Sequence, residues 1–135
     1  MPPTDAELTA FLSALRTAAV VGLSPRPDRP SHDVARYLQS RGLTILPVNP
    51  AVQEVLGADS VASVDDLTAA PDVVVVFRRP EDVPAVADAA VRRGARALWL
   101  QLGIRHPEAE AAAAAAGLFV VADRCIKQEF RRLLP

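Results

Sequence analysis

Glycine, serine and arginine residues cluster directly after the first apolar run of the chain. Gly22-Leu23-Ser24 follows the run 18–21, and Arg26, Arg29 and Ser31 come within the next seven positions. A glycine lets the backbone approach a ligand closely, serine hydroxyls donate to phosphate oxygens, and arginines supply complementary charge. The spacing is equally compatible with a phosphate-binding turn and with a polar loop whose arginines are solvated.

Two further apolar runs are each followed by groups that could contact a ligand. The valine run 73–76 leads into Phe77-Arg78-Arg79, and the run 97–100 leads into Gln101-Leu102-Gly103. Two adjacent arginines are not both buried without partners, so we expect them to meet solvent, a carboxylate or a ligand phosphate. Phe77 could pack on a base or a flexible ligand chain, or belong to the core. Gln101 offers amide donors and an acceptor, and Gly103 permits close approach of the backbone.

The residues that NAD-binding domains usually carry are missing. In the first turn Ser24 replaces the second glycine of a G-x-G-x-x-G pattern, and the third glycine is absent. Val48-Asn49-Pro50, which follows the second apolar run, contains no acidic residue to hold ribose hydroxyls. The sequence therefore disfavours NAD and leaves room for an adenosine whose ribose carries a phosphate.

Catalytic groups are sparse. Cys125 is expected near a helix start between Arg124 and Lys127, surroundings that favour a thiolate, although a half-buried structural cysteine would fit the same pattern. Nothing in the sequence places His32 or His106 beside it as a base. No catalytic residue and no metal site are assigned.

Strands and helices alternate along the chain. Thr4 and Glu7 form a capping-box pattern before an apolar stripe, which predicts an opening helix over about 5–16. Strands are expected at 18–22, 43–48, 73–77, 97–100 and 118–121, with helices capped by Ser31 and ended by Gly42, and over 81–93, 107–116 and 125–134. Residues 51–70 predict a short helix or turn at 53–57 and an edge strand near 60–62. This order predicts an α/β fold in a single domain, 1–135, with an open parallel sheet and helices on both faces.

Charge and cysteine content limit the classes of partner. The chain has 135 residues, a formal net charge of −1 and one cysteine. This charge gives no support to a nucleic-acid or membrane partner, and no stretch approaches the roughly 20 apolar residues of a membrane span. The N-terminus does not have the pattern of a signal peptide. A disulfide framework is excluded, and we expect a cytoplasmic protein.

Five segments, in order, resemble the stand-alone CoA-binding proteins of bacteria and archaea. The segments read VVGLS at 20–24 with RPS at 29–31, LPVNP at 46–50, DVVVVFRRPEDVP at 72–84, LWLQLGI at 98–104 and ADRCIK at 122–127. The same segments are similar to the N-terminal CoA-binding domain of the succinyl-CoA synthetase α-subunit. One departure is Phe130, at a position after Glu129 where the family often has histidine.

The resemblance implies a Rossmann-like sheet of about five to six strands that binds coenzyme A or an acyl-CoA. It assigns phosphate binding to residues 22–24 and Ser31, the adenosine side to 48–50, the groove lining to 77–79 and 101–103, and a looser nucleotide contact to Arg41. With the residue chemistry above, the candidate binding set is Gly22, Leu23, Ser24, Arg26, Ser31, Arg41, Val48, Asn49, Pro50, Phe77, Arg78, Arg79, Gln101, Leu102 and Gly103.

The chain has no room for the synthetase's phosphohistidine and ligase regions, so the resemblance favours binding without catalysis. Two alternatives stay open. One is a small NAD(P)-dependent oxidoreductase, and the other is an interaction subunit of an enzyme that uses acyl-CoA. The sequence indicates no particular acyl group, protein partner or oligomeric state.

Overall fold

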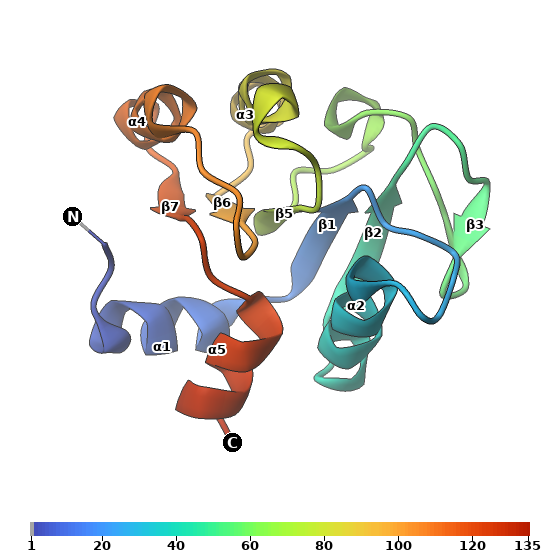
Figure 1. The fold of residues 1–135 in the computed structure, drawn as a ribbon, viewed down its shortest axis with the longest axis horizontal. Coiled ribbons are helices and arrows are strands. Elements are labelled where there is room, and N and C mark those ends of the chain that lie inside the picture. Colours follow the sequence, from blue (N-terminus) through green and yellow to red (C-terminus); the bar gives the residue numbers. More distant parts are fainter. Residues whose placement is uncertain (1) are drawn as a thin grey trace.

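The apolar runs of the sequence form one parallel sheet in the computed structural model, which describes residues 2–135 (Figure 1). Within these residues the five-stranded sheet has the order β2-β1-β5-β6-β7. Its strands are β1 (Thr17–Val21), β2 (Thr44–Val48), β5 (Val73–Val76), β6 (Ala97–Leu100) and β7 (Phe119–Val121). All four valines of β5 are buried, because strands pair on both sides of it and helices cover both faces.

Helices cover the two faces of the sheet separately. Figure 1 shows α1 (Asp5–Ala14), α2 (Pro30–Ser40) and α5 (Ile126–Leu133) on one face, and α3 (Val83–Arg93) and α4 (Pro107–Ala115) on the other. Alternate residues of β1 supply the two cores: Ala18 and Val20 face the first group of helices, and Ala19 and Val21 the second. The predicted α/β architecture with helices on both faces is confirmed. No helix within residues 2–135 is long and apolar enough to span a membrane.

The opening helix α1 has the predicted cap and ends earlier than predicted. Thr4 accepts from the Glu7 amide, and the Glu7 carboxylate accepts from the Thr4 amide, as a capping box requires. The helix ends at Ala14 instead of residue 16. The amides of Arg16 and Thr17 donate to the Asp72 carboxylate at 2.8 and 3.1 Å, and this contact holds them in extended chain leading into β1.

Residues 51–70, for which the sequence predicted little regular structure, contain a small hairpin. Strands β3 (Glu54–Val55) and β4 (Ala58–Asp59) pair antiparallel across Leu56 and Gly57, whose φ angles are 54° and 79°. Two positive φ angles suit a tight hairpin turn, so the turn alternative at 53–57 is correct and the helix is not. The expected edge strand near 60–62 is reduced to a single parallel bridge between Val61 and Val48.

Two helix starts differ from the predictions. Arg29, not Ser31, caps α2, with Pro30 in the first turn, a position that proline's fixed φ favours. The Ser31 hydroxyl lies inside the first turn and accepts the Ser24 amide instead. The 3₁₀ turn Pro80–Asp82 precedes α3, so the α-helix begins at Val83 instead of residue 81.

Candidate ligand-binding site

The carboxyl ends of β1 and β5 lie side by side where the order of the sheet changes direction. The Phe77 amide donates to the Val21 carbonyl at 2.9 Å, and the Gly22 amide donates to the Val48 carbonyl at 2.8 Å. The chain leaving β1 continues to α2 on one face, whereas the chain leaving β5 continues to α3 on the other. Such a switch point leaves a crevice, the usual place for a ligand in an open α/β sheet.

Gly22 packs directly against the segment that follows β5. Its φ is +85°, and a Cβ atom there would lie 2.5 Å from the Phe77 carbonyl oxygen and 3.1 Å from Cδ of Arg78. Only glycine fits this contact without displacing backbone. The absence of a side chain at Gly22 therefore brings the first turn and Arg78 together.

Hydrogen bonds hold the first turn in place. The Ser24 amide donates to the Ser31 hydroxyl at 2.9 Å, and the Arg26 amide donates to the Ser24 hydroxyl at 3.1 Å. The Asn49 side chain donates to the Leu23 carbonyl at 3.0 Å, which ties the turn to the end of β2. Both serine hydroxyls act here as acceptors, so each keeps its own hydrogen for another acceptor. Asn49 and Leu23 thus support the turn from within the fold.

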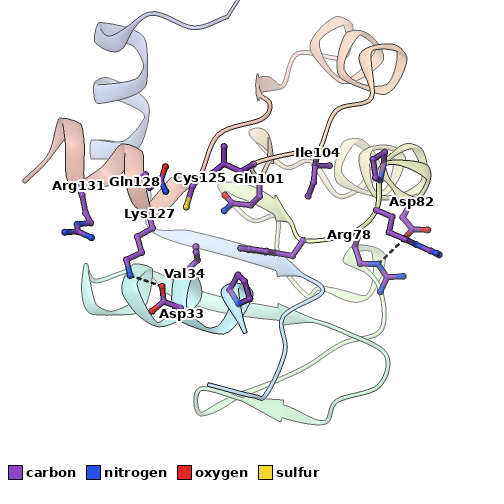
Figure 2. A pocket seen from close by; sticks show the side chains of 15 residues that line it. Asp33, Val34, Arg78, Asp82, Gln101, Ile104, Cys125, Lys127, Gln128 and Arg131 are labelled. Carbon is purple, nitrogen blue, oxygen red and sulfur yellow. Dashed lines mark hydrogen bonds and ion pairs between the residues drawn. The ribbon is translucent and has the colours of Figure 1, made fainter. Parts of the chain in front are cut away.

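The larger cavity at this edge has a volume of about 1050 Å³ and lies on the face covered by α2 and α5. Its wall is apolar around Val34, Phe77 and Ile104, with charged groups toward the ends (Figure 2). The lining residues are Pro30, Asp33, Val34, Phe77, Arg78, Arg79, Pro80, Asp82, Gln101, Leu102, Ile104, Cys125, Lys127, Gln128 and Arg131. The cavity can therefore hold a long ligand with an apolar middle.

Ion pairs mark the two ends of this cavity. At one end Nε of Arg78 lies 3.4 Å from Oδ2 of Asp82, and Nε of Arg79 lies 3.7 Å from the same oxygen. At the other end Nζ of Lys127 donates to Oδ2 of Asp33 at 2.8 Å. Figure 2 shows these pairs on opposite sides of the cavity, with Gln101 and Cys125 between them. Nε of Arg79 also lies 3.8 Å from Oε2 of Glu81, so two guanidinium groups face two carboxylates at the Arg78 end and their formal charges balance.

A smaller cavity, of about 300 Å³, lies next to the Arg78 end. Arg78 and Asp82 line both cavities, and Gly22 borders the smaller one. Its other lining residues are Val21, Val48, Pro50, Ala62, Ser63, Val64, Glu81, Ala85, Val86 and Ala89. The two cavities together form a groove, here called the switch-point groove, that crosses the sheet edge at Arg78.

The Asp33–Lys127 pair supplies a prediction about pH. The hydrogen bond from Lys127 is the main reason that the pKa of Asp33 lies below its usual 3.8. Because the folded pKa is lower than the unfolded one, the pair stabilises the fold above about pH 4, and this stabilisation is lost as the pH falls through the folded pKa. In Lys127→Met we expect an NMR titration of the Asp33 carboxyl to give a pKa closer to 3.8. An unchanged pKa would show that Lys127 does not hold this carboxylate in solution.

The structure brings most of the predicted binding residues to the groove. Phe77, Arg78, Arg79, Gln101 and Leu102 line the larger cavity, and Gly22, Val48, Pro50 and Arg78 line the smaller one. Leu23, Ser24, Ser31 and Asn49 lie in or under the adjoining turn.

Three predicted residues line neither cavity. Arg26 is exposed and pairs with Asp28. Arg41 caps the far end of α2, donates to the Tyr37 hydroxyl at 2.9 Å and lines neither cavity. Gly103 has a φ of +80° with open space around it, so its turn, and not a close neighbour, requires glycine. The structure therefore does not support the carry-over of a nucleotide contact to Arg41.

The sequence interpretation missed the wall that α5 provides. Lys127, Gln128 and Arg131 line the larger cavity because Ile126 and Phe130 are buried against the core beneath α2. Apolar residues four positions apart at 126 and 130 were the available signal, since they fix which side of the helix faces the cavity.

The histidines have structural positions. His106 caps α4, and its Nδ1 accepts the Ala109 amide at 3.1 Å. His32, in the first turn of α2, is only 8% exposed. Among residues 2–135, no three His, Cys, Asp or Glu side chains are grouped to hold a metal ion.

Comparisons with known proteins agree with this geometry. A protein family described as "CoA binding domain" matches residues 16–131. The chain is 41% identical over 125 residues to the uncharacterized protein YneT of Bacillus subtilis, covering 93% of each protein. It also superposes on the structure of cell-free ID.343 from Thermus thermophilus with a TM-score of 0.93 and 44% identity, over 98% of this chain and 100% of that one.

A more distant likeness extends to part of a larger enzyme. The dinucleotide-forming acetyl-coenzyme A synthetase 1 of Ca. Korarchaeum cryptofilum matches with a TM-score of 0.69 and 24% identity, over 77% of this chain and 25% of that one. At this identity the likeness shows a shared fold alone. The resemblance to stand-alone CoA-binding proteins is confirmed by the family match, which covers every segment that carried it.

Proposed function

Because the chain belongs to the family of CoA-binding domains, we propose that it binds coenzyme A or an acyl-CoA in the switch-point groove and catalyses no reaction of its own. The observation that carries this proposal is the meeting of the two cavities at Arg78, directly beside the Gly22 turn. CoA is a long molecule with a dianionic pyrophosphate between an adenosine and a flexible pantetheine arm. A groove with partly exposed guanidinium groups at the junction of two cavities suits that shape.

The pyrophosphate is assigned to the junction. The Arg78 guanidinium can pair with its oxygens, and the Ser24 hydroxyl can donate to them from the adjoining turn. Asp82 holds Arg78 and Arg79 near this point, and their side chains stay 43% and 75% exposed. The guanidinium groups are thus positioned before a ligand arrives, and a phosphate competes with Asp82 and Glu81 for them.

The two ends of CoA are assigned by size and chemistry. The smaller cavity has apolar walls from Val48, Pro50 and Val64, which suit the adenosine. The larger cavity has the apolar surface of Phe77 and Val34 for the pantetheine arm, with space beyond it for an acyl group. No acidic residue follows β2 at 49–50, as expected for a ribose that carries a phosphate.

Ligand-induced stabilisation tests the proposal. A ligand that binds only the folded state adds about 2.7 kcal/mol of stability at a hundredfold excess over Kd. We expect millimolar CoA to raise the Tm of ligand-free protein by several degrees, and NADH or NADPH to raise it far less. A larger shift with NADPH would favour the oxidoreductase alternative. No shift with any of them would contradict ligand binding in this groove.

The compartment of the protein and the kind of partner it has stay predictions. We propose a cytoplasmic protein whose ligand is a small molecule, with neither nucleic acid nor membrane as partner. This rests on the net charge of −1 and the single cysteine.

A further inference from the structure

A free thiol lies in the wall of the larger cavity. Cys125 precedes α5 as its N-cap residue, is partly buried and lines the cavity together with Gln101. The amide of the next residue, Ile126, donates to Oε1 of Gln101 at 3.0 Å. Figure 2 shows the Cys125 sulfur beside the Gln101 carboxamide, between the two charged ends of the cavity.

Gln101 carries an unused donor at this point. Only 5% of the residue is exposed. Its oxygen must face Ile126, because a backbone amide can only donate, so Nε2 occupies the other end of the carboxamide. Within the part of the chain that the structure describes, Nε2 has no hydrogen-bond partner. Nε2 is open to the cavity and not sealed in the core, so a ligand there can bring it an acceptor next to Cys125.

The pantetheine arm of CoA has the matching chemistry. It carries two amide carbonyls, which accept hydrogen bonds, and it ends in a thiol. Resting on the CoA site proposed above, we propose that Nε2 of Gln101 holds an amide carbonyl of the arm, and that the CoA sulfur then meets Cys125 and is taken up reversibly as a mixed disulfide.

The reaction is a thiol–disulfide exchange with the disulfide of CoA as the oxidant. The Cys125 thiolate attacks one sulfur of CoA disulfide, a new bond joins Cys125 to that sulfur, and the original sulfur–sulfur bond breaks. The departing CoA takes the electron pair as a thiolate and then gains a proton. Cys125 is oxidised and the departing CoA is reduced. An excess of free thiol reverses the exchange and releases the bound CoA.

The position of Cys125 makes the exchange selective. It is the only cysteine in the chain, so no second thiol of the protein can displace the bound CoA. The adenosine and pyrophosphate of CoA bind at Arg78 in this proposal and so bring the CoA sulfur close to Cys125. CoA disulfide then reacts faster than a disulfide of pantetheine alone, because binding raises the local concentration of the reacting sulfur.

Intact-mass spectrometry over time tests the inference. Reduced, desalted protein is mixed with low, equal concentrations of CoA disulfide or of pantethine, the disulfide of pantetheine. We expect a CoA adduct, with a gain of one CoA less two hydrogens, to form at least about tenfold faster than the pantetheine adduct. The adduct should disappear with reductant and be absent from Cys125→Ser.

A matched variant tests the part played by Gln101. Gln101→Glu keeps an oxygen for the Ile126 amide and loses the donor, so we expect slower reaction with CoA disulfide. The added carboxylate disfavours the neighbouring thiolate and slows attack on any disulfide, so the rate with CoA disulfide is divided by the rate with dithiodipyridine, which has no amide to hold, and we expect this ratio to fall. Equal slowing with both reagents would show a general change at the thiol and would overturn the role given to Nε2.

The outcomes separate this inference from the proposed function. Calorimetric titration of wild-type protein with CoA in a phosphine reductant measures binding without any disulfide. Binding there, with no adduct or with equal rates for CoA disulfide and pantethine, overturns the inference and leaves the CoA site intact. Absence of binding overturns both.

Discussion

Gly22→Ala is expected to destabilise the protein by about 2–5 kcal/mol. A left-handed backbone costs a non-glycine residue about 1–2 kcal/mol, and overpacking adds about 1–3 kcal/mol. Both penalties apply here, because φ is +85° and the new Cβ would lie 2.5 Å from the Phe77 carbonyl oxygen. Urea unfolding followed by circular dichroism measures the loss, and a Tm lower by roughly 10 °C should accompany it.

Gly42→Ala is the matched control. Gly42 also has a positive φ, +93°, but nothing lies within 4 Å of a Cβ at that position. We expect it to cost only the backbone penalty, about 1–2 kcal/mol, and to leave CoA binding unchanged. If the two variants are equally stable and bind CoA equally, the close approach of Gly22 to the Arg78 segment is not what shapes the groove.

Arg78→Ala is expected to weaken CoA binding by about tenfold to a hundredfold. A hydrogen bond to a charged group contributes about 1.5–3 kcal/mol, and each 1.4 kcal/mol is a factor of ten in Kd. Since the structure places Arg78 against Gly22, we expect it to bind the pyrophosphate. CoA and dephospho-CoA should therefore lose affinity by the same factor in calorimetric titrations.

Arg16→Ala controls for the loss of one positive charge. Arg16 is exposed and lies at the amino end of β1, whereas Arg78 follows the carboxyl end of β5. We expect its Kd for CoA to stay within about twofold of the wild-type value. A loss of affinity in Arg78→Ala for CoA but not for dephospho-CoA would instead assign Arg78 to the ribose phosphate.

The sheet could be predicted from local patterns because burial on both faces leaves a strong signal. The valine run at 73–76 has no polar alternation, and it forms the buried central strand β5. The capping box at Thr4 and Glu7 was equally readable, since both hydrogen bonds lie within four residues. Phe77, Arg78 and Gln101 could be placed at the ligand edge because carboxyl ends of parallel strands share one edge.

The far wall of the groove could not be predicted in the same way. The pair between Asp33 and Lys127 joins residues 94 positions apart, and it depends on α5 returning to the face that carries α2. Ser31 shows that a contact between residues close in sequence can also escape prediction. Its hydroxyl could cap α2 or accept the Ser24 amide, and in the structure α2 begins at Pro30 and the hydroxyl accepts the Ser24 amide.

A crystal structure of the wild-type protein with bound CoA tests the central claim most directly. We expect the pyrophosphate within hydrogen-bond distance of the Arg78 guanidinium beside the Gly22 turn. The adenosine should occupy the smaller cavity, and the pantetheine arm should pass Phe77 toward Nε2 of Gln101. CoA bound outside the switch-point groove, or bound with its adenosine in the larger cavity, would contradict the account.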